Sequence, residues 1–309
     1  MRLQPGIRTI GVCGLGQMGA AAAVSFKRAG YRVLAWDHNP ANREALPGTA
    51  GGLESWLDEH STQRADPGGK IETAPTLQDL DEEADVLLDC IVEDLEQKVA
   101  LFKGCRSAKA RQAIFITTTS GLSITKIGRA SGCGHLLAGT HFWNPPHLMP
   151  LVEVIRGDDT PDEVMDGVCG LIESIGKIYV RVNQDIPGFI GNRMLHALWR
   201  EAISLVEMGV ATPEDIDLVA RLTFGLRMPA VGPLENMDLV GLDLIERIHQ
   251  YLLADIADNH GPAELLESNV RDGRLGVKSG RGFYNWSARD AEELIERRDR
   301  QIINQLGDL

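Results

Sequence analysis

A histidine and a glutamate in apolar surroundings are the side chains of this sequence best suited to move a proton. His141 opens the string His-Phe-Trp-Asn-Pro-Pro, and Glu153 follows twelve positions later inside the apolar run Leu-Val-Glu-Val-Ile at 151–155. If that run is a strand, alternation turns the glutamate away from its two valine neighbours, into or beside a packed layer. An unpaired carboxylate there would be costly or would take up a proton, so Glu153 needs a partner.

His141 is the expected partner of this carboxylate. The intervening Asn-Pro-Pro at 144–146 supplies a turn that could fold the two segments together. A buried acid would then hold the imidazole in one tautomer and make it more basic, which is the arrangement of a general base. The alternative is a core histidine and a surface glutamate that never touch, and only geometry decides between the two.

A glycine-rich turn near the N-terminus has the spacing of a dinucleotide-binding loop. A short buried strand is expected at 8–13, and it runs directly into Gly-Leu-Gly-Gln-Met-Gly at 14–19. An Ala-rich helix over 20–29 and a second strand over 31–36 are expected to follow. Strand, turn, helix and strand in this order make the glycine motif far more specific than it is alone.

Each residue of the motif has a physical role. Gly14 permits the tight turn, Gly16 lets the backbone approach a pyrophosphate at the helix N-terminus, and Gly19 allows the helix to pack closely on the strand. Asp37 ends the second strand, where it can bond a ribose 2′-hydroxyl and would repel a 2′-phosphate, so NAD is favoured over NADP. The expected cofactor-binding residues of this loop are Gly14, Gly16, Gln17, Met18, Gly19 and Asp37.

Composition favours a two-domain enzyme that acts on a small molecule. The chain has 309 residues, 43% of them hydrophobic, which is ample for two cores. Its net charge of −13 argues against nucleic acid or an anionic membrane surface as the main partner.

The cysteines indicate a reducing compartment. Five of them are scattered without metal-ligand spacing, so free thiols and no metal site are expected. The first residues hold no apolar signal core, and no run is long enough to span a bilayer, so we expect a cytoplasmic protein.

The order of elements divides the chain into two expected domains. Up to residue 184, strand and helix signals alternate, as in a Rossmann-type, doubly wound, mostly parallel α/β sheet; from 185 to 309 the periodicity predicts a smaller all-helical domain. Later strands are expected at 70–73, 84–91, 113–118, 135–140, 151–156 and 177–182. Helices are expected at 53–60, 94–108, 123–130, 161–174, 195–205, 234–256 and 291–306.

Several motifs follow one another in an order that resembles the L-3-hydroxyacyl-CoA dehydrogenase family over essentially the whole chain. They are the glycine turn at 14–19, Ile-Val-Glu-Asp-Leu at 91–95 with Lys98, Thr-Ser-Gly-Leu at 119–122, His-Phe-Trp-Asn-Pro at 141–145, Leu-Val-Glu-Val-Ile at 151–155, Asp-Ile-Pro-Gly-Phe-Ile-Gly-Asn-Arg at 185–193, Gly-Pro at 232–233 with Gly-Leu-Asp at 241–243, and Lys-Ser-Gly-Arg-Gly-Phe-Tyr at 278–284.

The resemblance implies a reaction and a set of site residues. The reaction would be NAD-dependent, reversible oxidation of a secondary alcohol, 3-hydroxyacyl-CoA to 3-oxoacyl-CoA, by a homodimer built through the helical domain. His141 would be the base and Glu153 its partner, with Ser120 and Asn192 at the reacting oxygen. Family positions at the NAD ribose and nicotinamide match Glu93, Lys98, Ser120, Asn144 and Lys278. From local pattern alone, Ser120 and Asn192 could instead be helix caps and Lys98 a solvated lysine.

Departures from the family pattern concern the substrate. Family members that use acyl-CoA carry several lysines in a helical hairpin after the second strand. Here the cations between 40 and 73 are Arg43, Arg64 and Lys70, against the acids Glu44, Glu54, Asp58, Glu59, Asp66 and Glu72. That balance suits a multiply phosphorylated CoA poorly. Relatives that oxidise carnitine, gulonate or pyridine carboxylates from vitamin B6 breakdown resemble the chain as well, so an acyl-CoA and a small hydroxy acid are both open.

Two other classes of protein share part of this pattern. β-Hydroxyacid dehydrogenases of the hydroxyisobutyrate type share the glycine turn but use a helix-borne lysine with a Gly-rich lead-in, which the second domain lacks. A non-catalytic NAD-binding structural protein, like the crystallins of this superfamily, would have no need of a buried His141–Glu153 pair.

Overall fold

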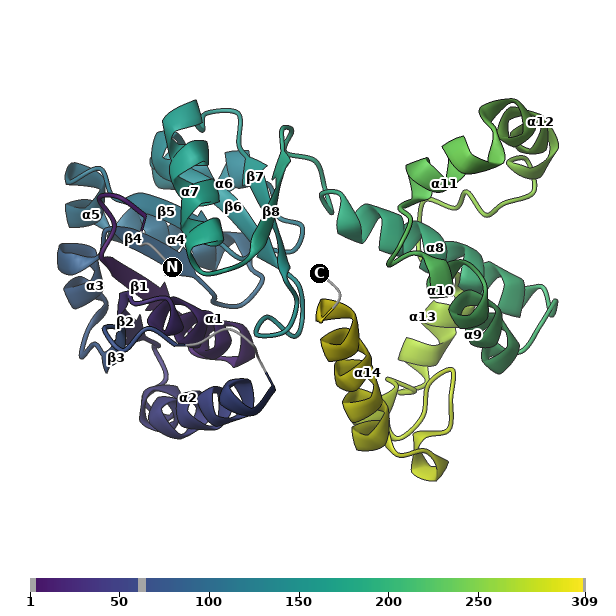
Figure 1. Ribbon diagram of the computed structural model, residues 1–309, viewed down its shortest axis with the longest axis horizontal. Helices are drawn as coiled ribbons and strands as arrows, with labels where there is room; N and C mark the ends of the chain where they lie inside the picture. The colour runs from purple at the N-terminus through teal and green to yellow at the C-terminus, as the bar shows by residue number, and fades with distance from the viewer. Residues whose placement is uncertain (1–3, 61–64, 308–309) are drawn as a thin grey trace. The chain divides into compact units, whose positions relative to one another are not determined.

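The computed structural model describes residues 4–60 and 65–307, and internal contacts divide the chain into two compact units. The sheet unit is Met1–Arg193 and the helical unit is Met194–Leu309 (Figure 1). The division falls inside helix α8 (Gly191–Glu207), whereas the sequence places the boundary after residue 184.

The sheet unit contains an eight-stranded sheet in the order β3-β2-β1-β4-β5-β6-β7-β8, which confirms the predicted Rossmann-type fold. All neighbouring strands run parallel except β6 and β7, which are antiparallel. The strands are β1 (Thr9–Cys13), β2 (Arg32–Trp36), β3 (Lys70–Thr73), β4 (Val86–Asp89), β5 (Ile114–Thr117), β6 (Leu137–Phe142), β7 (Leu151–Arg156) and β8 (Ile178–Val182).

Helices cover both faces of this sheet (Figure 1). On one face α1 (Gln17–Arg28) and α7 (Asp162–Ser174) bury apolar side chains in the same core as Val152 and Val154 of β7. On the other, α3 (Leu77–Glu83), α4 (Leu95–Gly104), α5 (Arg106–Ala110) and α6 (Ile124–Ser131) form a second core with Ile155. The alternation predicted for 151–155 is therefore present, and it turns Glu153 to the face of Ile155.

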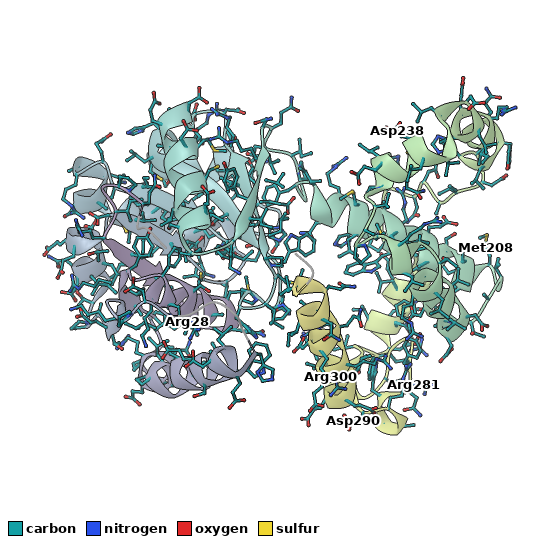
Figure 2. The ribbon with its side chains drawn as sticks, viewed as in Figure 1. Arg28, Met208, Asp238, Arg281, Asp290 and Arg300 are labelled. Carbon is teal, nitrogen blue, oxygen red and sulfur yellow. The ribbon has the colours of Figure 1, made fainter. Side chains whose placement is uncertain are left out.

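Helix α2 (Pro40–His60) is much longer than the helix expected at 53–60. It runs through Pro47, which the sequence favours as a break. Packing overrides that local preference, because Ala50 and Leu57 are buried against Val24 of α1. Arg28 of α1, labelled in Figure 2, also donates to the Asp58 carboxylate of α2, at 2.6 Å.

Other elements also differ from expectation. Helix α3 was not expected; it is short and starts at a capping box formed by Thr76 and Asp79. The strand expected at 135–140 is a 3₁₀ turn, η1 (Gly134–Leu136), followed by β6, so His141 lies inside a strand and not after one.

The described part of the helical unit has helices and no extended strand, apart from isolated bridges at Gly276, Arg281 and Asn285. The helix expected over 234–256 is split in two by Gly241, whose φ of 104° is outside the helical range. The helices after α8 are α9 (Pro213–Leu222), α10 (Phe224–Arg227), α11 (Pro233–Val240), α12 (Leu242–Leu252), α13 (Glu264–Arg271) and α14 (Ala291–Leu306), with 3₁₀ turns η2 (Val277–Ser279) and η3 (Trp286–Ala288).

Candidate active site

His141 and Glu153 face each other across the antiparallel strands β6 and β7. They are directly paired in the register, so their side chains project on the same side of the sheet. Nδ1 of His141 lies 2.7 Å from Oε2 of Glu153, and the two residues are 4% and 2% exposed. The contact expected from the sequence is present, and both groups are shielded from water.

The second oxygen of Glu153 anchors the carboxylate to the start of α8. Oε1 accepts hydrogen bonds from the backbone N–H groups of Ile190 and Gly191, at 2.9 and 3.0 Å. Burial alone would raise the pKa of Glu153, but the hydrogen bonds from His141, Gly191 and Ile190 outweigh it, so the pKa lies below its ordinary value. A charged glutamate therefore faces the imidazole.

Aromatic rings enclose the imidazole of His141. The ring centroids of Trp143 and Phe189 lie 5.1 and 5.7 Å from that of His141. The indole packs so tightly on Gly191 that a Cβ there would come within 2.1 Å of it. Glycine at 191 thus leaves room for the indole of Trp143, and its N–H donates to Glu153.

Ser120 lies on an exposed turn after β5, and its backbone links two neighbouring loops. Its N–H donates to Oε1 of Glu93 at 2.9 Å, and its carbonyl accepts from Nδ2 of Asn192 at 2.9 Å. Ser123, not Ser120, caps helix α6 by accepting from the N–H of Lys126. The capping alternative for Ser120 is therefore wrong, and its exposed hydroxyl is available to a ligand.

Lys98 is not a solvated lysine. Only 1% of it is exposed, and its ammonium lies 2.8 Å from Oδ2 of Asp89, itself fully buried. The same ammonium lies 3.7 Å from Oε2 of Glu93. Asp89 is not among the predicted site residues, although an acid at the end of a buried apolar strand indicates a buried polar partner.

The glycine turn has the geometry that a dinucleotide requires. Gly14 has a φ of 93°, and a Cβ there would lie 2.6 Å from the carbonyl oxygen of Cys90. A Cβ on Gly19 would lie 1.8 Å from the carbonyl oxygen of Gly14. At Gly16, by contrast, the Cβ position is open and no side chain caps the N-terminus of α1. That helix end can therefore receive a phosphate.

Asp37 is held ready beside this turn. Its carboxylate accepts from the N–H groups of Leu15 and Asn39, at 2.7 and 2.8 Å, and from Nδ2 of Asn42, at 3.0 Å. Burial would raise the pKa of Asp37, but these hydrogen bonds lower it overall. A fixed carboxylate at the end of β2 fits the ribose hydroxyls of NAD, and its charge disfavours an added 2′-phosphate.

The other predicted cofactor-binding residues lie at the start of α1, in the loop after β6 and in the helical unit. Gln17 and Met18 open helix α1, and Asn144 is exposed in the loop after β6, before a cis peptide bond to Pro145. Lys278 is exposed in η2 of the helical unit. Across 4–60 and 65–307 no cluster of His, Cys, Asp or Glu has the arrangement of a metal site, and no helix is long and apolar enough to cross a membrane.

Sequence comparison assigns both parts of the chain to one family. The family profile "3-hydroxyacyl-CoA dehydrogenase, NAD binding domain" matches residues 9–186, and the profile of its C-terminal domain matches residues 188–286. A probable 3-hydroxybutyryl-CoA dehydrogenase of Bacillus subtilis is 38% identical over 292 residues, with 91% of this chain and 98% of the relative covered.

A relative with a different kind of substrate is similar over more of the chain. The 5-formyl-3-hydroxy-2-methylpyridine 4-carboxylate 5-dehydrogenase of Mesorhizobium japonicum is 31% identical over 298 residues, with 96% of each chain covered. A crystal structure of an enzyme with this activity, described as an NAD⁺-dependent dismutase, has a TM-score of 0.90 at 31% identity and covers 96% of this chain and 97% of its own.

Proposed function

Because this chain belongs to the 3-hydroxyacyl-CoA dehydrogenase family, whose members are NAD-binding oxidoreductases, we propose that His141 is the general base that takes the hydroxyl proton from the substrate. The hydrogen bond between His141 and Glu153 carries this proposal. It supplies the two things a base requires, a fixed ring and a fixed tautomer.

The tautomer follows from the charge on Glu153. A carboxylate only accepts hydrogen bonds, so Nδ1 of His141 must carry the proton that points at it. Nε2 is then the unprotonated nitrogen and can accept the hydroxyl proton of a substrate. Once the imidazole is protonated, the negative charge of Glu153, anchored by Ile190 and Gly191, stabilises the cation.

Bound NAD would accept a hydride from the carbon that carries the hydroxyl group. The backbone at Gly16 and the start of α1 would hold the pyrophosphate, and Asp37 would accept from the adenosine ribose. Glu93, Lys98, Asn144 and Lys278 remain the residues proposed for the other ribose and the nicotinamide.

Ser120 and Asn192 would hold the reacting oxygen. The Ser120 hydroxyl is exposed, and the Asn192 amide has a second N–H besides the one bonded to the Ser120 carbonyl. Two such donors stabilise charge that develops on oxygen in the transition state.

For the substrate we propose a small carboxylate-bearing alcohol without CoA. The described cations between residues 40 and 73 are already engaged: Arg43 donates to the backbone oxygen of Asp37, and Lys70 pairs with Glu72. Arg64 lies outside the described residues. The pyridine-carboxylate relative, with its high structural similarity over nearly the full chain, points the same way.

The 3-hydroxyacyl-CoA substrate remains the second candidate. Its support is the 38% identity with the Bacillus subtilis relative, which exceeds the identity with the pyridine-carboxylate enzyme. A substrate panel separates the two candidates: kcat/KM for 3-hydroxybutyryl-CoA, free 3-hydroxybutyrate, carnitine and pyridine alcohols or aldehydes, each with NAD. Turnover confined to the CoA thioester would reject our choice of substrate, and binding of NADH without turnover on any compound would favour a structural role.

His141→Gln tests the base itself. We expect kcat to fall by roughly 10²- to 10⁴-fold, as for other positioned acid–base groups, with NADH affinity unchanged. His135→Gln is the matched control, because His135 is exposed in the 3₁₀ turn that leads into the same strand. Equal turnover in the two variants would remove His141 from the reaction.

We further propose that two copies associate through the helical unit and that the protein works in a reducing, cytoplasmic setting. Apolar side chains such as Leu226, Leu234 and Leu239 are 72 to 76% exposed in the single chain, more than solitary surface residues require. The five cysteines are unpaired, and four of them are buried.

A further inference from the structure

The fully buried carboxylate of Asp89 lies where the strand order of the sheet reverses. Strand β4 pairs with β1 on one side and with β5 on the other, and Asp89 stands in register with Cys13 and Thr117 at the three strand ends. Open parallel sheets bind their ligands at this switch point. Asp89 therefore lies at the end of the sheet where the dinucleotide turn follows β1 and the Ser120 turn follows β5.

Three groups satisfy this carboxylate. Oδ2 accepts from the ammonium of Lys98 at 2.8 Å and from the hydroxyl of Thr117 at 2.6 Å, while Oδ1 accepts from the N–H of Ile91 at 3.0 Å. The bonds to Thr117 and Ile91 tie the end of β4 to β5 and to the loop that follows β4. The bond to Lys98 ties it to helix α4.

Lys98 connects Asp89 to Glu93. Besides Asp89, its ammonium contacts the backbone oxygen of Ile91 at 3.4 Å and Oε2 of Glu93 at 3.7 Å. All three acceptors belong to the segment from Asp89 to Glu93, which leads from β4 into α4. The buried ammonium of Lys98 thus holds this short loop in one conformation through three contacts.

Glu93 links the loop to the turn after β5. Its Oε1 accepts from the hydroxyl of Thr119 at 2.5 Å and from the N–H of Ser120 at 2.9 Å. The backbone of Cys90, in the same loop, touches Gly14 so closely that no Cβ fits there. The loop from Asp89 to Glu93 therefore packs against the dinucleotide turn and is also hydrogen-bonded to Ser120.

We propose that Asp89 is a positioning residue for the cofactor: through Lys98 it fixes the position of Glu93, and with it the turn that carries Ser120. Stability alone does not account for the pair, because apolar residues of similar volume are commonly as stable as a buried ion pair. The inference needs only that the sheet unit binds NAD; it does not depend on the proposed substrate or on His141 as the base.

A double-mutant cycle on NADH affinity tests the proposal, with Asp89→Asn, Glu93→Gln and the double variant measured by NADH fluorescence on the full chain. We expect Asp89→Asn alone to raise the Kd for NADH by roughly tenfold, an effect typical of removing a coupled charged contact. In the Glu93→Gln background it should add little, because Asp89 acts on the cofactor site through Lys98 and Glu93. Full multiplication of the two effects, or an unchanged Kd in Asp89→Asn, would overturn the proposal.

Asp81→Asn is the matched control. Asp81 is also a buried carboxylate of the sheet unit, 8% exposed, but it accepts from the N–H groups of Ser107 and Ala108 at the start of α5. Its variant should lower the Tm and leave the Kd for NADH unchanged; an increase in Kd equal to that of Asp89→Asn would mean general loosening and would also overturn the proposal.

Thr117→Val serves if Asp89→Asn fails to fold. It keeps the shape of the side chain, removes one donor from Oδ2 of Asp89, and should raise the Kd for NADH by a smaller factor. An unchanged Kd would then count against the proposal. Because NADH binding is measured without substrate, the result holds whether or not the substrate panel identifies a turnover.

Discussion

The two units of this chain differ in how far their apolar side chains are buried. In the sheet unit, apolar side chains of the strands are enclosed on both faces by helices, in two cores that are almost fully buried. In the described part of the helical unit, residues 194–307, Asn269 alone is buried, and this unit holds all but four of the exposed large apolar side chains among the described residues. A sheet with both faces covered is complete in one chain, whereas amphipathic helices with open apolar faces need a further surface.

The predicted catalytic residues and the proposed association surface therefore belong to different units. Every predicted catalytic residue belongs to the sheet unit, where His141 is hydrogen-bonded to Glu153 and Asn192 to the backbone of Ser120. Gly191, which precedes Asn192 in the chain, donates to Glu153 and so connects the two pairs. The apolar surface that we propose for a second copy belongs to the helical unit. Substitutions in the two units should therefore fail in different ways.

The largest effect is expected in the sheet core. Phe115→Ala removes a fully buried ring that packs edge-on against Phe102, with centroids 5.3 Å apart, and should lower the free energy of unfolding by about 4 kcal/mol. Phe283→Ala is the matched change in the helical unit, where the ring is 41% exposed, and should cost about 1 kcal/mol. Urea denaturation measures both values. Equal losses would mean that the two units are buried alike, against the comparison above.

A smaller effect is expected from charge on the open face of α11. Leu239→Asp, at a residue 76% exposed in the single chain, should weaken association of two copies by about 2 kcal/mol, a roughly thirtyfold rise in the dimer Kd. Analytical ultracentrifugation over a concentration series gives that constant. Asp238→Ser, at the neighbouring exposed position labelled in Figure 2, is the control and should leave it unchanged. A wild-type chain that stays monomeric at all concentrations would end the proposal of a dimer.

Glu153→Gln should lower the stability of the sheet unit by about 1.5 kcal/mol at pH 7, because the hydrogen bonds to its charge are weakened. The pKa of Glu153 is lower in the folded state, so its contribution is present above the unfolded-state value of about 4.3 and is lost as the pH falls below it. The difference in unfolding free energy between wild type and variant should therefore shrink as the pH is lowered from 7 to below about 4.3. A difference that stays constant over this range would show that the charge is not what matters.

Local patterns in the sequence predict much of the sheet unit. Alternation in 151–155 placed Glu153 on the face away from its valine neighbours, and the glycine turn with Asp37 placed the cofactor loop. Both signals depend on residues close in the sequence, where period and turn chemistry are informative.

The misses depend on contacts between distant segments. Helix α2 continues through Pro47 because Ala50 and Leu57 find Val24, and no local propensity reveals that contact. Lys98 is buried because its ammonium pairs with Asp89, the last residue of strand β4. In the helical unit the pattern gave helices, but a periodic apolar face does not say which surface covers it.

The smallest effect is expected at an apolar side chain exposed on the sheet unit. Ile178 opens the edge strand β8 and is 54% exposed. Ile178→Thr keeps a residue that favours strands, so the free energy of unfolding should change by no more than about 0.5 kcal/mol and association should not change. The same denaturation and ultracentrifugation measurements apply. If this variant weakened association as much as Leu239→Asp, the interface would extend over the sheet unit, and association would no longer be separable from the unit that carries the chemistry.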